Sequence, residues 1–319
     1  MKTGDIMKGL NSNTFQRLSV LSILIIMCII FGLSSKVFFS TENLLTVALQ
    51  TVIIAIIAIG QTFVIITTGI DLSIGSTIAL SGIITSMLLV AKVPVFFSIM
   101  VGLLVGIIIG FINGLVIVYG KVPPFIVTLG TMSIVRGIAL VLTNGIPITN
   151  LPPGFTVIGS GRVLGIPIPV YIMIVLALVF GFILSKTKLG RYNYAIGSNF
   201  EAARLSGIDT NKVLISIYSI SGFLAACAGI ILTARIVSGQ PTAGTGYELD
   251  AVAASVIGGA SLLGGEGTVL GAVIGAFVIG VLRNGLNLLN VSAFWQQIAI
   301  GIVIIAAVYF DGLRRNKLS

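Results

Sequence analysis

Long apolar runs constrain this chain more than any other feature. A helix needs about 20 mostly apolar residues to cross a bilayer, so these runs can be read as successive membrane spans. The segments are Leu18–Leu33, Leu44–Ile66, Leu72–Ala91, Val95–Val118, Phe125–Leu142, Pro169–Leu184, Val213–Ile236, Leu249–Leu263, Thr268–Arg283 and Ala293–Phe310. The segment Leu249–Leu263 is short and interrupted by glycine, so we expect a bent or partial span there. The runs predict an all-α, polytopic membrane protein with about ten transmembrane helices.

The composition excludes a soluble domain and several kinds of chemistry. Only 8% of the residues are charged and the mean hydropathy is +1.17, whereas soluble domains carry about 25% charged residues. Histidine is absent, which rules out imidazole metal ligands and histidine acid–base catalysis. Both cysteines lie in apolar runs and are expected to be small packed side chains. We therefore expect no catalytic residue, no metal site and no cofactor of the chain's own.

The basic residues predict the orientation in the membrane. If both termini are cytoplasmic and the ten spans alternate, twelve of the 18 lysines and arginines lie inside and three lie in clear outside loops. The other three, Arg136, Arg235 and Arg283, fall within spans or at their ends. This bias follows the positive-inside rule. It explains the net charge of +9 without nucleic-acid binding, and with no linker in the chain it predicts one transmembrane domain over residues 1–319.

A polar segment, Ser185 to Lys212, interrupts the apolar pattern. Five basic residues lie in it, and a bilayer core cannot hold them, so it is expected to face water on the cytoplasmic side. It contains NFEAARLSGI, a short helix pattern that ends at a glycine. On the outside, the segment Thr143–Ile168 contains four prolines and is expected to form an irregular cover.

The motif GIDLSIGS, Gly69 to Ser76, joins the second and third predicted spans. Asp71 or Ser73 can cap the following helix, and this alone accounts for the motif. Alternatively, Asp71 anchors a gate near the membrane surface or couples transport to protons, because a carboxylate there is costly.

The glycine-rich segment Gly258 to Gly267 superficially resembles a phosphate-binding loop. A Walker A loop needs a lysine and a hydroxyl residue after its last glycine, but Gly264 is followed by Gly265 and Glu266. We expect a tight reversal between the eighth and ninth spans, and no ATP hydrolysis by the chain itself.

Polar residues near the predicted outer surface have two interpretations. Glu248 and Asp250 follow Tyr247 at a helix start, where the helix dipole favours acids; alternatively, the three residues form a mouth that meets a soluble binding protein or the solute.

Amides near the predicted spans also have a structural and a functional interpretation. Asn284 and Asn287 share a helix face near Trp295, which suits an interfacial aromatic belt. Together with Asn113 they also suit a polyhydroxylated solute, because amides bond hydroxyl groups and a ring stacks on a sugar's C–H face. Each amide can instead simply bond across helices.

Four blocks of sequence resemble a known family. GIDLSIGS, LGRYNYAIGSNFEAARLSGI, QPTAGTGYELDAVAASVIGGASLLGGEGTVLGAVIGA and NGLNLLNVSAFWQQ look like the permease subunits of bacterial ribose-type ABC sugar importers. The resemblance extends over roughly residues 15 to 312. It implies a homodimer of permeases in membrane lipid, a cytoplasmic ATPase that binds ATP and Mg²⁺, and an extracytoplasmic sugar-binding protein.

The family's coupling segment, which meets the ATPase, can be carried over to this chain. It falls on Asn199, Glu201, Ala202, Ala203, Arg204, Leu205 and Gly207, inside a coupling loop of about residues 185–212. The small alanines allow a partner to approach, Leu205 offers an apolar contact and Gly207 ends the helix. A solvated helix without a partner is the alternative. Glu266 and Arg283 depart from the ribose pattern.

The resemblance predicts an importer of D-ribose that switches access under the control of a separate ATPase. The residue pattern also leaves room for another pentose or hexose, for a furanosyl signalling molecule, and for a secondary transporter that works alone. Asp71, Glu248 and Asp250 would have to carry ion coupling in that last case.

Overall fold

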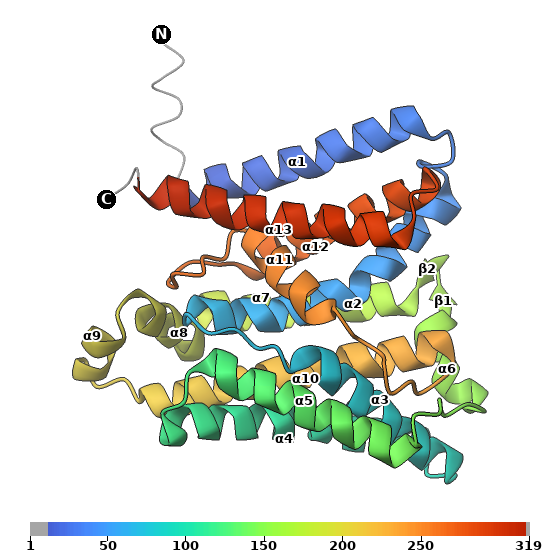
Figure 1. The fold of residues 1–319 in the computed structure, drawn as a ribbon, viewed down its shortest axis with the longest axis horizontal. Coiled ribbons are helices and arrows are strands. Elements are labelled where there is room, and N and C mark those ends of the chain that lie inside the picture. Colours follow the sequence, from blue (N-terminus) through green and yellow to red (C-terminus); the bar gives the residue numbers. More distant parts are fainter. Residues whose placement is uncertain (1–11, 317–319) are drawn as a thin grey trace.

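The structure, a computed structural model, describes residues 12–316 and is dominated by helices that run roughly parallel to one another (Figure 1). The helices are α1 (Ser12–Ser34), α2 (Thr41–Ile66), α3 (Ile74–Val90), α4 (Val95–Gly120), α5 (Pro124–Thr143), α6 (Pro153–Ser160), α7 (Ile168–Lys186), α8 (Lys188–Ser198), α9 (Phe200–Leu205), α10 (Thr210–Ile236), α11 (Tyr247–Ile257), α12 (Val269–Leu288) and α13 (Ala293–Asn316). The predicted helical fold class is confirmed.

Several of these helices can cross a membrane. Six are long and apolar enough by length and composition, namely α2, α4, α5, α7, α10 and α12, and α1, α3 and α13 contain shorter apolar stretches. The eighth predicted segment forms only the 11-residue helix α11, because the glycine-rich chain that follows it turns back. The protein is therefore a multi-pass membrane protein with one short internal helix.

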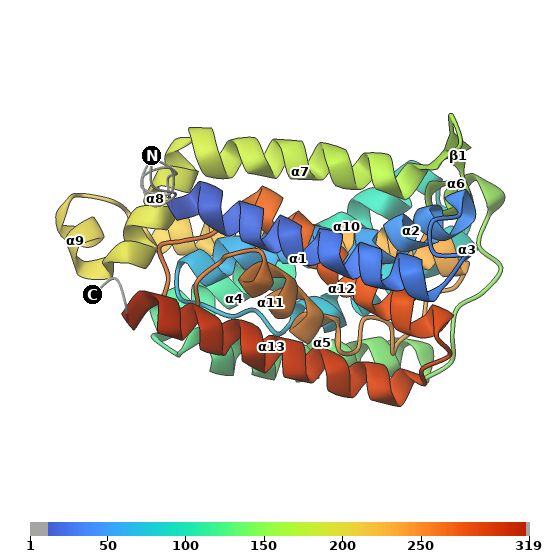
Figure 2. The ribbon, with the colours of Figure 1, turned by 90° about the horizontal axis from the view of Figure 1, so that it is seen from above.

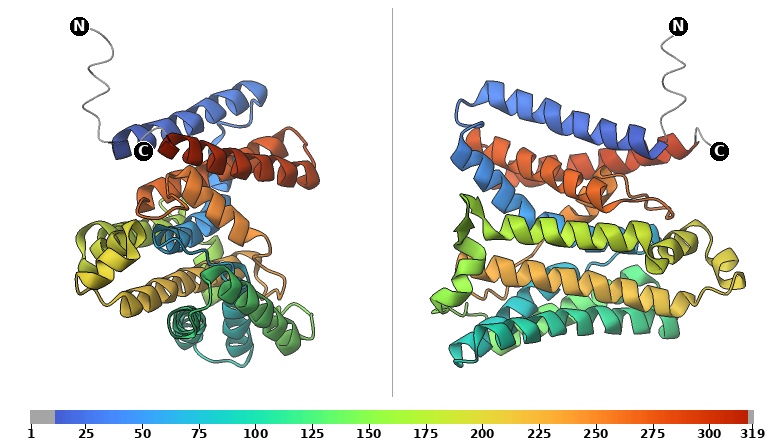
Figure 3. Two further views of the ribbon diagram at one scale, coloured as in Figure 1. Left: turned by 60° about the vertical axis from the view of Figure 1, so that its left-hand side comes forward. Right: turned by 180° about the vertical axis from the view of Figure 1, so that it is seen from behind.

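Two helices form the centre of the bundle. Residues 51–66 of α2 are buried on every side, which is typical of a helix whose sequence is apolar all round. Helix α10 packs against α2, α3 and α4; seen from behind, it lies between α7 and α4 (Figure 3).

Glycines allow α4 and α10 to approach closely. A Cβ atom added at Gly106 would meet the backbone of Gly222, and one added at Gly110 would meet the backbone of Tyr218. Small residues at helix crossings are a common way of packing helices in lipid, where the hydrophobic effect gives no driving force between them.

The two ends of the bundle differ. Helices α8 and α9 project at one end, beside the start of α1 and the last turns of α13, and we call this the α9 end (Figure 2). The opposite end, which we call the hairpin end, carries α6 and an antiparallel pair of strands, β1 (Arg162–Val163) and β2 (Ile166–Pro167). Of the twelve basic residues predicted to lie inside, Lys2, Lys8 and Lys317 fall outside the described residues.

The segment after α5 is more ordered than the irregular cover that its prolines predict. Pro153 occupies the first turn of α6, where its missing N–H costs nothing. The hairpin reverses through Leu164 and Gly165, both with positive φ. Prolines at helix starts and a tight turn thus produce local structure here.

Candidate functional site

Helix α9 is a short, capped helix at the end of the molecule. The Asn199 side chain accepts a hydrogen bond from the Ala202 N–H at 2.9 Å, which caps its start. Gly207, with φ +81°, follows its end and donates to the Arg204 carbonyl at 3.1 Å. Glu201 and Arg204 form an exposed ion pair at 2.8 Å. The predicted helix therefore forms with the expected boundaries.

The two alanines of α9 face different surroundings. Ala202 is exposed, but Ala203 is only 4% exposed and packs against the protein's own core. Leu205, by contrast, is 82% exposed. A partner at this end would meet Ala202 and Leu205, whereas Ala203 holds the helix in place.

A second helix in the same polar segment, α8, was not predicted from the sequence. Thr187 caps its start by accepting from the Gly190 N–H at 3.4 Å. Asn193 donates to the Phe63 carbonyl at 3.2 Å, and the Tyr194 hydroxyl donates to the Gly267 carbonyl at 2.6 Å. Helix α8 therefore connects α9 to the central helix α2 and to the turn before α12.

A pocket of about 810 Å³ opens beside α9. It lies between the link from α4 to α5, around Lys121, and the link from α9 to α10, around Asp209. Asp209 caps α10 by accepting from the Lys212 N–H at 3.1 Å. Its carboxylate also pairs with Lys212 Nζ at 2.8 Å, and these hydrogen bonds lower the pKa of Asp209. The cap at the start of α10 therefore stays charged to a lower pH than an ordinary aspartate would.

The reversal predicted for residues 258–267 is confirmed. Gly264 and Gly265 both have positive φ, and the Gly265 N–H donates to the Ile66 carbonyl at 2.9 Å. This contact places the turn against the end of α2, next to α8. The segment acts as a structural joint at the α9 end.

Asp71 lies at the centre of a buried polar network. Its Oδ1 accepts from the Ser73 N–H at 3.0 Å and from the Ser73 hydroxyl at 2.6 Å, and its Oδ2 accepts from the Ser221 hydroxyl at 2.7 Å. The amide of Asn113 donates to Ser73 Oγ at 2.9 Å and accepts from the Thr131 hydroxyl at 2.6 Å. Asp71 therefore joins the α2–α3 link to α10 and, through Ser73, to α4 and α5.

The network consists of neutral donors around one carboxylate. With its nitrogen turned towards the Asp71 carbonyl, the Gln61 side-chain amide donates to that carbonyl and accepts from the Asp71 N–H, both at 3.2 Å. Among residues 12–316, no group of three or more cysteine, aspartate or glutamate side chains is arranged to hold a metal ion. Asp71 and Asn113 are separate candidates in the sequence, and the folded chain brings them together through Ser73.

The other predicted path residues do not join this network. Asn284 forms two reciprocal hydrogen bonds with Asn43, at 3.0 and 2.8 Å, and Asn287 accepts from Gln296 at 2.7 Å. Trp295 is 65% exposed on α13. These side chains bond between helices or face outwards at the hairpin end.

The predicted docking residues at the start of α11 make different contacts, although Tyr247 and Asp250 line the same pocket. Glu248 Oε1 accepts from the Gly246 N–H at 3.1 Å. Asp250 is buried and forms an ion pair with Arg283 at 2.7 Å. The position of Asp250 therefore does not support direct contact with a docked protein, because its carboxylate is paired inside the bundle. The same pair gives a structural reason for Arg283, which departs from the ribose pattern.

Two arginines that the sequence places within or at the ends of spans were given no partner there. Arg136 donates to the Pro241 and Ala243 carbonyls at 2.6 and 2.8 Å, and Arg235 donates to the Leu49 carbonyl at 2.7 Å. An arginine inside an apolar run was the sequence signal for such hydrogen bonds, because a charge in lipid requires partners. Their partners are backbone carbonyls, which no side-chain pattern reveals.

A bundle of long apolar helices with a short helix pair projecting at one end is typical of a multi-pass membrane protein. The chain belongs to the permease component family of the branched-chain amino acid transport system, whose model matches residues 43–308.

Curated relatives place the chain more closely within that family. It is 49% identical to the ribose import permease protein of Haemophilus influenzae, over 92% of each chain, and 50% identical to that of Bacillus subtilis, over 90% of each chain. The D-allose transport system permease protein of Escherichia coli is 40% identical, over 91% of this chain and 90% of the relative. No solved structure matches the chain. The resemblance inferred from the sequence blocks is confirmed, and the chain is a multi-pass permease of the inner membrane.

Proposed function

We propose that the chain is the membrane-spanning permease of an ATP-driven importer for D-ribose. The main support for this proposal is the 49–50% identity to two ribose import permeases over at least nine-tenths of each chain. The relatives named for D-allose and L-arabinose transport are 40% and 38% identical. This difference favours ribose over another monosaccharide.

The partners are a cytoplasmic ABC ATPase, an extracytoplasmic sugar-binding protein and a second copy of the permease. The sequence has no Walker A loop, so ATP and Mg²⁺ would bind to the ATPase. The exposed Leu205 on α9 supports a docked partner at this end. The coupling loop of about residues 185–212 would then be one part of a single permease domain.

The membrane topology of this proposal has ten spans, with the α9 end and both termini in the cytoplasm. Supporting it, the start of α1 and the last turns of α13 lie at the α9 end (Figure 2). Helix α11 contributes the short eighth crossing, completed by the glycine-rich turn.

Motion of the ATPase would be transmitted through α8. This helix is bonded to α2 at Phe63 and to the Gly267 turn, so displacement of α9 pushes on both the centre of the bundle and the start of α12. The Asp71 network ties the α2–α3 link to α10. A rigid-body change between two packings then switches access from outside to inside.

Uptake by the complete transporter in proteoliposomes tests the substrate. Labelled D-ribose should enter when the sugar-binding protein and enclosed ATP are present, and unlabelled ribose should compete better than D-allose or L-arabinose. Ionophores that collapse proton and sodium gradients should leave uptake unchanged. Uptake abolished by the ionophores would favour a secondary transporter, in which Asp71 carries the coupling.

A further inference from the structure

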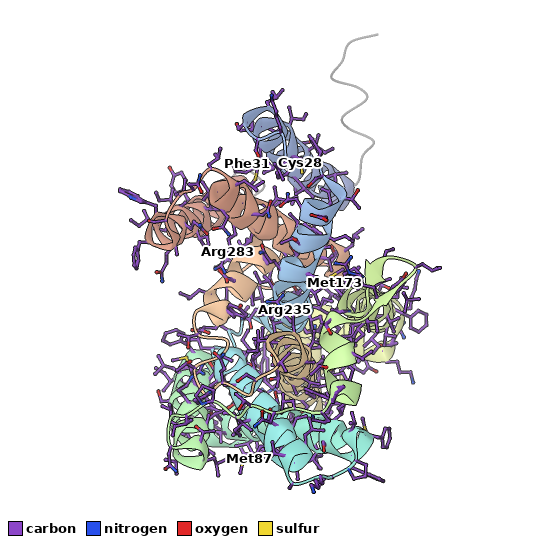
Figure 4. All side chains as sticks on the ribbon, turned by 90° about the vertical axis from the view of Figure 1, so that its right-hand side faces the viewer. Cys28, Phe31, Met87, Met173, Arg235 and Arg283 are labelled. Carbon is purple, nitrogen blue, oxygen red and sulfur yellow. The ribbon has the colours of Figure 1, made fainter. Side chains whose placement is uncertain are left out.

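A small pocket between α11, α12 and α13 combines polar and apolar walls near the hairpin end. It has a volume of about 270 Å³, and its lining includes Tyr247, Asp250, Arg283, Gln297 and Ile300. Arg283 lies among the orange helices of the C-terminal part of the chain (Figure 4). The pocket is distinct from the Asp71 network and from the α9 end.

The charges in this pocket balance. Both oxygens of Asp250 accept from Arg283 Nη2, at 2.9 and 2.7 Å, so the pair is neutral as a whole. The Asp250 side chain is 3% exposed, whereas the Arg283 side chain is 33% exposed. Arg283 Nε is buried without a hydrogen-bond partner among the described residues. The guanidinium has five N–H donors, so the pair retains capacity to bond a ligand.

We infer that this pocket is a contact site for a neutral monosaccharide on its way through the permease. Hydroxyl groups both donate and accept, so they can bond the guanidinium, the carboxylate and the Gln297 amide together. Tyr247 and Ile300 offer apolar surface to the C–H face of a sugar ring. A phosphate or a cation would gain little, because the ion pair already cancels its own charge. The inference rests on the proposed function and deepens it by placing a sugar contact.

The pocket can be filled by substitution without a clash at the backbone. A Cβ atom at Gly301, which lines the pocket, meets nothing within 4 Å. Gly301→Leu should lower ribose uptake by the complete transporter at least tenfold. Gly137→Leu is the matched control, since Gly137 in α5 also has open space for a Cβ atom. It should keep uptake within twofold, and both variants should retain the ATPase subunit.

Cysteine labelling tests occupancy directly, even if Gly301→Leu folds poorly. In the complete transporter with Cys28 and Cys227 replaced by alanine, the variants Gln297→Cys and Trp295→Cys are exposed to a thiol reagent. Trp295 is close in sequence but does not line the pocket. D-ribose at high concentration should slow labelling of Gln297→Cys at least threefold and leave Trp295→Cys unchanged. Inorganic phosphate should protect neither position.

The outcomes separate this site from the proposed function. Equal labelling of Gln297→Cys with and without D-ribose, D-allose and L-arabinose, in a complex that imports ribose, would overturn the site alone. Protection by phosphate would also overturn it. Protection by D-allose or L-arabinose in a complex that does not import ribose would support the site and overturn the ribose assignment.

Discussion

At the residue scale, polar side chains inside the bundle bond to one another across helices. Asn43 pairs with Asn284, Asp250 pairs with Arg283, and Ser221 donates to Asp71. Lipid offers no hydrogen-bond partner, so an unpaired polar group there costs several kcal/mol. These pairs therefore fix which helices are neighbours.

Ser221 gives the clearest test of this view, because Ser219 is a matched control on the same helix. Ser221 donates to Asp71, whereas Ser219 donates to the Ile215 carbonyl of its own helix. Hydrogen bonds to charged groups contribute about 1.5–3 kcal/mol. We expect Ser221→Ala to destabilise the purified protein by about 2 kcal/mol more than Ser219→Ala, measured by unfolding in mixed micelles. Equal effects of the two substitutions would show that the Asp71 bond contributes nothing.

In two of these pairs, the sequence allowed one member to be predicted but not its partner. Asp71 and Asn284 stand out as polar residues near apolar runs, whereas Ser221 and Asn43 do not. The partners are 150 and 241 residues away along the chain. Hydropathy and helical periodicity describe neighbours within a segment, so they carry no information about such distant contacts.

At the scale of elements, the α8–α9 pair links the polar end to the core. Helix α9 could be predicted because Asn199 and Gly207 mark its ends. Helix α8 was missed because glycines and Asn193 make up most of its buried face, and Asn193 and Tyr194 bond to backbone carbonyls that no side-chain pattern reveals. The short helix α11 lies where a partial span was predicted, because Gly258 and Gly259 interrupt the apolar segment Leu249–Leu263.

Leu205 tests the role of α9 as a docking element. Replacing this exposed apolar side chain by a charged one, in Leu205→Glu, should weaken binding of the ATPase subunit at least tenfold, which is about 1.4 kcal/mol. Leu164→Glu is the control, because Leu164 is 95% exposed at the opposite, hairpin end. Co-purification with the ATPase, measured as a function of its concentration, should fall for Leu205→Glu and persist for Leu164→Glu. Unaltered binding in Leu205→Glu would place the ATPase elsewhere.

At the scale of the whole molecule, the two ends are built from different elements. The α9 end carries α8, α9 and the glycine-rich turn, and the hairpin end carries α6, the strands and the approach to the Arg283 pocket. Apolar runs and basic residues were enough to predict a helical bundle with two such ends. The short length of α11, and the helix and strands between α5 and α7, depend on packing contacts that the sequence pattern does not reveal.

Reporter fusions test the orientation. Alkaline phosphatase, which is active only outside the cytoplasm, should be active when fused after Leu164 and inactive when fused after Leu205. A fluorescent protein that matures only in the cytoplasm should fluoresce at the C-terminus. The reverse pattern of phosphatase activity would invert the proposed topology and remove α9 from the reach of a cytoplasmic ATPase.

If the proposed function is right, this chain is a passive path for ribose, and a separate ATPase supplies the energy. The most direct measurement is D-ribose uptake into proteoliposomes that hold the permease and enclosed ATP, with the sugar-binding protein outside, with and without the ATPase subunit. We predict uptake against a gradient only when the ATPase and ATP are both present. Accumulation of ribose by the permease in the absence of the ATPase would show that a separate ATPase does not drive transport.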